Sequence, residues 1–234
     1  MKQFSNLYIF CFSSALVLVV AAALSFTAMS LQDKQRENIE IERQQNILAA
    51  LGITSSKAEV LGKFEQHISQ GIVIRADGRI VEGEAADGVD LKKEQAKPAN
   101  ERLLPLYLAQ EDGVIVIPVR GAGLWGPIWG NVALEPDLNT IRGVTFDHAG
   151  ETPGLGSQIA TPQFQQQFLN KRLFDAANRF VSIKVEKIGT FTPDNHTVDG
   201  ISGGTITSKA LEAMVFNSIE PYQTYFSQKR NKTE

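Results

Sequence analysis

The longest apolar pattern in the chain is an uninterrupted run near the N-terminus. Between Lys2 and Asp33, 30 residues carry no formal charge. Residues 7–31 are long enough to cross a hydrocarbon core of ~30 Å as a helix. A cleaved signal peptide is the alternative, because residues 21–23 are three alanines, but a signal core is typically about 7–15 residues. The pattern therefore predicts a retained membrane anchor over residues 1–32.

Helical spacing of apolar residues predicts three further helices. Residues 33–52 form a juxtamembrane helix that stops at Gly52. Thr161 and Pro162 open a second helix, as a cap followed by a first-turn proline. The third runs from about Ser208 to Gln228 and is kinked or ended by Pro221. The apolar side of the second helix consists of Phe164, Phe168 and Leu169. The apolar side of the third consists of Leu211, Met214, Val215, Ile219, Tyr222 and Phe226.

Short apolar runs separated by turn residues predict strands. Residues 71–83 contain two such runs around Asp77-Gly78, a hairpin signal, and residues 84–100 read as a solvated linker. Further strands are expected over residues 113–119, 131–134, 141–146 and 181–188. The prediction is an α+β fold with a twisted, mainly antiparallel sheet and flanking helices. Residues 53–100 form its N-terminal part, 101–228 its core and 229–234 a tail.

Composition excludes several kinds of chemistry. The net charge is -3, from 23 basic and 26 acidic residues, and no basic stripe indicates nucleic acid. The only cysteine, Cys11, lies in the apolar run, so the chain can form no internal disulfide and no thiolate-bound iron–sulfur cluster. His67, His148 and His196 show no metal-ligand spacing. Electron transfer by this chain would need an organic cofactor.

Residues 121–126 match the glycine fingerprint of dinucleotide-binding proteins. That motif requires a helix whose N-terminus faces the pyrophosphate. Pro127 follows the last glycine directly, and Gly130 and the strand-like run beyond it leave no helix. The match to the fingerprint therefore does not indicate an NADH-binding site in this chain.

The segment with the clearest chemistry is Asp199-Gly200-Ile201-Ser202-Gly203-Gly204-Thr205-Ile206-Thr207-Ser208. Glycines and hydroxyls at a helix start make a phosphate cradle, because free amides and the helix dipole favour an anion. The alternative is an ordinary capping turn, with Thr207 or Ser208 as the N-cap.

This segment resembles the recognition motif of flavin transferases. The resemblance covers Asp199, Gly200, Ser202, Gly203 and Gly204, where alanine is usual in the last position, and it implies FMN attached by a phosphoester to Thr205. Two further stretches, residues 123–130 and 143–156, are similar to the C subunit of the sodium-translocating NADH:quinone reductase family. The second stretch ends in a stiff turn that is expected to contact the flavin: Glu151, Thr152, Pro153, Gly154, Leu155 and Gly156. Flavin contacts are also expected from Leu124, Trp125, Thr207 and Ser208. An ordinary β–α turn is the alternative for this loop.

The resemblance implies an electron-relay subunit in a bacterial inner membrane, with its domain on the periplasmic side. The charges flanking the span have too little bias to orient it. The implied partners are the other reductase subunits, including a second flavin-bearing membrane subunit, and a flavin transferase. Two alternatives remain: the related subunit of a ferredoxin:NAD electron-transport complex, and a membrane-tethered assembly or binding module without flavin.

Overall fold

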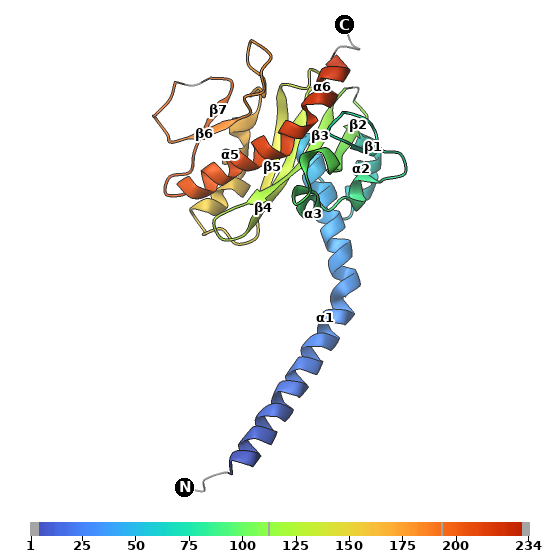
Figure 1. The fold of residues 1–234 in the computed structure, drawn as a ribbon, viewed down its shortest axis with the longest axis vertical. Helices are drawn as coiled ribbons and strands as arrows, with labels where there is room; N and C mark the ends of the chain where they lie inside the picture. Colours follow the sequence, from blue (N-terminus) through green and yellow to red (C-terminus); the bar gives the residue numbers. More distant parts are fainter. Residues whose placement is uncertain (1–4, 112, 193, 231–234) are drawn as a thin grey trace. The chain divides into compact units, whose positions relative to one another are not determined.

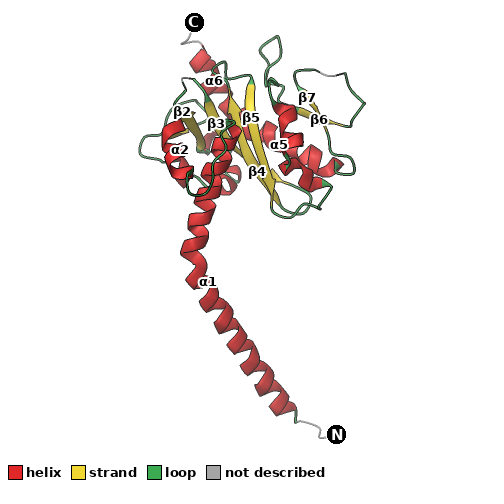
Figure 2. Ribbon diagram, turned by 180° about the vertical axis from the view of Figure 1, so that it is seen from behind, coloured by secondary structure: helices red, strands yellow, loops and turns green. Residues whose placement is uncertain are grey.

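A computed structural model describes residues 5–111, 113–192 and 194–230. The chain divides into a helical unit that ends at Arg43 and a compact unit that begins at Gln44. The helices, drawn as coiled ribbons in Figure 1, are α1 (Asn6–Ala50), α2 (Val60–His67), α3 (Leu91–Gln95), α4 (Pro162–Gln165), α5 (Thr205–Ile219) and α6 (Gln223–Arg230). The strands, yellow in Figure 2, are β1 (Ile68–Ile74), β2 (Leu104–Ala109), β3 (Ile115–Ala122), β4 (Pro127–Leu134), β5 (Ile141–His148), β6 (Lys184–Glu186) and β7 (Thr197–Asp199).

The N-terminal unit consists of the first part of α1. In the described part of the chain, α1 is the one helix long and apolar enough to cross a membrane. Its large apolar side chains, such as Val17 and Phe26, are exposed in the structure. The separate helices expected over residues 7–31 and 33–52 are one continuous element, because neither a proline nor a glycine interrupts the sequence between them. Residues 1–4 of the predicted anchor lie outside the described residues.

The compact unit is built on a five-stranded sheet with the order β1-β2-β3-β4-β5. Every neighbouring pair is antiparallel. This confirms the α+β prediction with its antiparallel sheet. Strands β3, β4 and β5 overlap the three predicted ranges and extend beyond them, and the run 181–188 supplies only the short β6, which pairs in parallel with β7.

Both faces of this sheet are buried. On β3, Ile115, Ile117 and Val119 belong to the core that includes the apolar side of α5, whereas Val116 belongs to a second core. The second core also contains Ile47 from the end of α1. Two buried faces explain why the strands are nearly continuous apolar runs rather than alternating patterns.

The end of α1 approaches the sheet backbone closely. The Thr145 hydroxyl donates a hydrogen bond of 3.2 Å to the Asn46 carbonyl. A Cβ added at Gly143 would collide with the Ala50 carbonyl oxygen. Helix α1 ends at Ala50, and Gly52 in the turn after it is left-handed, with φ +82°, which confirms the predicted stop.

Two predictions between residues 71 and 100 hold only in part. The Asp77-Gly78 turn forms, and beyond it Ile80 bridges Ile74 and the Val81 amide donates to the Val73 carbonyl at 2.8 Å, but no longer strand follows the turn. The expected linker contains α3, whose N-cap Asp90 accepts from two backbone amides. The polar composition of residues 84–100 suggested a solvated segment, but the Glu94 side chain turns inward and is buried.

The C-terminal helices largely follow the prediction. All six predicted apolar residues from Leu211 to Phe226 are buried, and Pro221 lies in a 3-10 turn, Glu220–Tyr222, that separates α5 from α6. The predicted tail is wrong in its first residues, because α6 continues to Arg230; residues 231–234 lie outside the described residues. The Thr161 hydroxyl caps α4, but Leu169 is exposed because a 3-10 turn, Gln166–Phe168, redirects the chain.

The close approach at Gly143 predicts that Gly143→Ala destabilises the domain by about 1–3 kcal/mol, since the colliding atom belongs to the backbone and cannot rotate away. Urea unfolding of the purified protein measures this change. Gly62→Ala is the control: Gly62 lies in α2 with nothing within 4 Å of an added Cβ, so helix propensity predicts up to about 1 kcal/mol of stabilisation. Equal midpoints for wild type and Gly143→Ala would contradict the described approach.

Candidate functional site

Three segments distant in sequence meet at one edge of the compact unit. The hairpin turn after Ala122 joins β3 to β4, and β4 rather than a helix begins at Pro127, as the sequence predicts. Ile128 pairs with His148, so the loop after β5 starts beside this turn. The third segment is the glycine turn that precedes α5.

The Glu151 carboxylate joins these segments. Its Oε1 accepts a 3.0 Å hydrogen bond from the Trp125 amide in the hairpin turn. Its Oε2 accepts a 2.5 Å hydrogen bond from the Thr207 hydroxyl in the first turn of α5. The residue is 4% exposed, and its own amide donates to His148 Nδ1 at 3.2 Å.

Two glycines make room for this carboxylate. A Cβ at Gly156 would lie 2.5 Å from both Glu151 Oε2 and Thr207 Oγ1. A Cβ at Gly123 would lie 2.5 Å from Glu151 Oε1. Both distances are shorter than nonbonded contacts allow, so only glycine fits at these positions without rearrangement.

Hydrogen bonding keeps Glu151 ionised at neutral pH. Burial is the largest single influence and opposes the charged form, but donors from Thr207, Trp125 and Leu124 together outweigh it and lower the pKa of the carboxyl group below its usual value. The site therefore holds one fixed negative charge beneath its surface.

The start of α5 offers an exposed hydroxyl beside free helix amides. Thr205 is exposed, and the N-cap residue Gly204 gives no side-chain cap. Gly203 has φ +73°, a conformation that glycine adopts without strain. The amides of the first helical turn have no intrahelical acceptor and carry the positive end of the helix dipole. This arrangement fits a phosphate group esterified to Thr205.

The other two hydroxyls of the predicted motif point inward. Thr207 and Ser208 are 2% and 3% exposed. Thr207 donates to Glu151, and the Ser208 hydroxyl accepts a 3.0 Å hydrogen bond from the Ile201 amide. The alternative in which Thr207 or Ser208 caps the helix is wrong, because the helix begins before both.

Exposed apolar side chains lie on the three segments that Glu151 joins. Trp125 is 69% exposed, and Leu124, Leu155 and Ile206 are between 40% and 61% exposed. Leu155 reaches the glycine turn, since a Cβ at Gly203 would lie 2.9 Å from its Cδ2. Such a surface suits contact with a flat aromatic ring.

The loop after Glu151 is a tight turn at the surface. Thr152, Pro153 and Gly154 are exposed, and Gly154 has φ +76°. The Thr152 carbonyl accepts from the Leu155 and Ser157 amides, and the Ser157 hydroxyl accepts from the Gly154 amide at 3.1 Å. These bonds fix where Leu155 and the Thr152 side chain project.

The first residues of the motif lead from β7 into the turn. The Asp199 amide donates to Gln167 Oε1 at 2.9 Å, and the Gly200 amide donates to the Glu186 carbonyl at 2.6 Å. Ser202 is exposed at the turn itself. Asp199 thus ends a paired strand, and its backbone is held before the turn begins.

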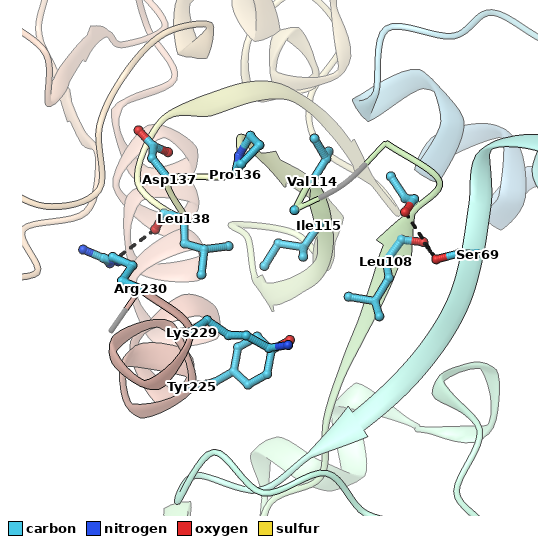
Figure 3. A pocket seen from close by; sticks show the side chains of 12 residues that line it. Ser69, Leu108, Val114, Ile115, Pro136, Asp137, Leu138, Tyr225, Lys229 and Arg230 are labelled. Atoms are coloured by element: carbon cyan, nitrogen blue, oxygen red, sulfur yellow. Dashed lines mark hydrogen bonds between the residues drawn. The ribbon is translucent and has the colours of Figure 1, made fainter. Parts of the chain in front are cut away.

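A pocket of about 460 Å³ lies beside Thr205. Its wall runs from the glycine turn to β6 and includes Lys187 and Lys209. A larger pocket of about 580 Å³ is shown in Figure 3, where Leu108, Ile115 and Leu138 face Tyr225, Lys229 and Arg230. Among the described residues none lines both pockets, and the larger one contains no residue of the predicted site.

Three of the predicted cofactor contacts have partners within the chain. Glu151, Thr207 and Ser208 are buried and hydrogen-bonded to groups of this chain, which the sequence did not indicate. Sequence reasoning also missed Ile206 and His148. Ile206 directly follows Thr205 at a helix start, a position that faces outward, whereas nothing in the sequence pairs His148 with Glu151.

The lowered pKa of Glu151 gives a prediction about acid stability. A carboxyl group with a lowered folded-state pKa stabilises the fold above its ordinary value near 4.5 and loses this contribution as the pH falls through the folded-state value. Glu151→Gln should cost about 1–3 kcal/mol at pH 7, and the difference from wild type should shrink towards pH 3.5. Urea unfolding across this range measures it. A difference that grows on acidification would contradict the assignment.

Comparison with known proteins identifies the family. A family model described as "FMN-binding domain" matches residues 123–220. The C subunit of the Na(+)-translocating NADH-quinone reductase of Vibrio vulnificus is 36% identical over 216 residues, which cover 84% of each chain. The corresponding protein of Pseudomonas aeruginosa is 31% identical over 224 residues, covering 85% of each chain.

Solved structures agree. The crystal structure of the corresponding protein from Parabacteroides distasonis matches with a TM-score of 0.77 and 37% identity, covering 84% of this chain and 97% of that one. The crystal structure of Shewanella oneidensis NqrC matches with a TM-score of 0.69 and 29% identity, covering 81% of this chain and 97% of that one. The chain belongs to the family of C subunits of the Na(+)-translocating NADH-quinone reductases.

Proposed function

We propose that this chain carries FMN covalently, through a phosphoester to the Thr205 oxygen, and serves as an electron carrier in a membrane reductase. The main support for this proposal is the placement of the three hydroxyls at the start of α5. Thr205 is exposed, whereas Thr207 and Ser208 are buried and already hydrogen-bonded. Thr205 is therefore the accessible acceptor of the helix start.

The surrounding backbone would stabilise the ester. The uncapped first turn of α5 presents amides and the positive end of the helix dipole to the phosphate. Gly203 and Gly204 let the backbone approach the phosphate oxygens closely. In the reaction, a flavin transferase would break the phosphoanhydride bond of an activated flavin nucleotide: the Thr205 oxygen loses its proton and forms the new O–P bond to the flavin phosphate, and the nucleotide on the other side of the broken bond leaves. The protein then gains the mass of FMN less one water.

The exposed apolar residues would bind the flavin ring. Leu124, Trp125 and Leu155 offer apolar contact, and the exposed Thr152 offers a hydroxyl for the polar edge of the ring. Bound FMN supplies one- and two-electron redox chemistry. The chain's own part is to hold and orient the cofactor, and covalent attachment prevents its loss from an exposed site.

The names of the relatives support a place in a whole complex. We propose that the protein passes electrons derived from NADH toward ubiquinone and that the complete complex couples this transfer to sodium export. A second flavin-bearing membrane subunit would be its redox partner. Helix α1 would anchor the chain in a bacterial inner membrane, with the compact unit on the periplasmic side.

Replacing the acceptor tests the attachment. Co-expressed with a flavin transferase, wild-type protein should give a fluorescent band on a denaturing gel, and Thr205→Val should give none. Thr205→Ser keeps a hydroxyl at this position and should retain a band. Fluorescence of Thr205→Val equal to wild type would contradict the assignment, and unfolding curves of both variants establish that they are folded.

A cysteine label tests the orientation. In a Cys11→Ser background, Ser227→Cys places a thiol on the exposed side of α6. A membrane-impermeant maleimide should label it in cells whose outer membrane alone has been made permeable. Labelling only after the inner membrane is opened would place the compact unit in the cytoplasm, contrary to the proposal.

A further inference from the structure

We infer that Glu151 is the positioning residue of the flavin site, and that its buried carboxylate holds the Trp125 turn and the Thr205 helix start in one arrangement. This inference rests on the proposed function for its consequence, but its structural part concerns the chain alone. Glu151 would act through Thr207 and Trp125, and not by touching the cofactor.

The two oxygens of Glu151 bind partners from different parts of the chain. The Trp125 amide lies 26 residues before it, and the Thr207 hydroxyl lies 56 residues after it. Both partners adjoin residues of the proposed site: Trp125 is itself a ring contact, and Thr207 lies two residues after the acceptor Thr205. A shift of the carboxylate therefore moves both sides of the site together.

The packing around Glu151 leaves it little freedom. Gly123 and Gly156 lie against its two oxygens so closely that neither position admits a Cβ. The backbone amide of Glu151 is held by His148 Nδ1. A buried carboxylate fixed in this way transmits displacement between its partners, because it cannot rotate to accommodate one of them alone.

A second buried carboxylate supplies the matched comparison. Glu94 is 8% exposed, accepts from the Leu103 amide at 2.9 Å and from Lys97 Nζ at 2.8 Å, and also has a lowered pKa. Its partners lie only nine and three residues away. Glu94 thus organises a local segment, whereas Glu151 joins the segments that carry the proposed ring contacts and the flavin acceptor.

The inference predicts that Thr207 and the Trp125 amide are coupled through Glu151, although neither donates a hydrogen bond to the other. In the flavin-free protein, Thr207→Val removes the bond to Glu151 Oε2. Exchange of the Trp125 amide hydrogen, measured by NMR, should then accelerate about tenfold, because the carboxylate that accepts from it is no longer fixed. Thr207→Ser keeps the hydroxyl and should restore slow exchange, and Glu94→Gln should leave exchange at Trp125 unchanged.

The same variants test the consequence for attachment. With a flavin transferase, Thr207→Val and Glu151→Gln should take up FMN on Thr205 about tenfold more slowly than wild type, whereas Thr207→Ser and Glu94→Gln should match wild type. Unchanged Trp125 exchange in Thr207→Val would overturn the inference. Accelerated exchange with unchanged attachment would overturn the positioning role at Thr205. Failure of wild type itself to take up FMN would overturn the proposed function, while the exchange experiment still decides the structural part.

Discussion

One buried carboxylate determines the arrangement of the site. Glu151 accepts from the hairpin turn through one oxygen and from α5 through the other, and it is ionised because these donors outweigh the cost of burial. A charged group left unpaired in this position would be strongly destabilising, so the three segments must fold together around it. The glycines at 123 and 156 follow from the same constraint, since their missing side chains are the space that the carboxylate occupies.

The sheet provides the frame for this interaction. Its register brings the β3–β4 turn and the last residues of β5 to the same end of the sheet. Helix α5 packs on one face of the sheet through its apolar side. The end of α1 packs on the opposite face. The last turns of α1 belong to the compact unit, and Ile47 is part of this second core.

The sequence predicted the features that depend on local spacing. The apolar side of the last helix, the stop at Gly52 and the cap at Thr161 are set by residues within a few positions of one another, and the structure confirms them. The resemblance of three short segments identified the family. What the sequence could not show is pairing over distance: β1 pairs along its length with β2, and Glu94 turns inward because Leu103 and Lys97 meet it. For the same reason the sequence did not show that the Glu151 carboxylate accepts from Thr207 and Trp125.

The most direct test of this account is the site of modification in native protein. Peptide mass spectrometry with fragmentation across residues 199–209 reports which oxygen carries the added group. The account predicts FMN less one water on Thr205 alone, because Thr207 and Ser208 are buried and hydrogen-bonded while Thr205 is exposed at an uncapped helix start. An unmodified peptide, or the flavin phosphate on Thr207, Ser208 or Ser202, would contradict it.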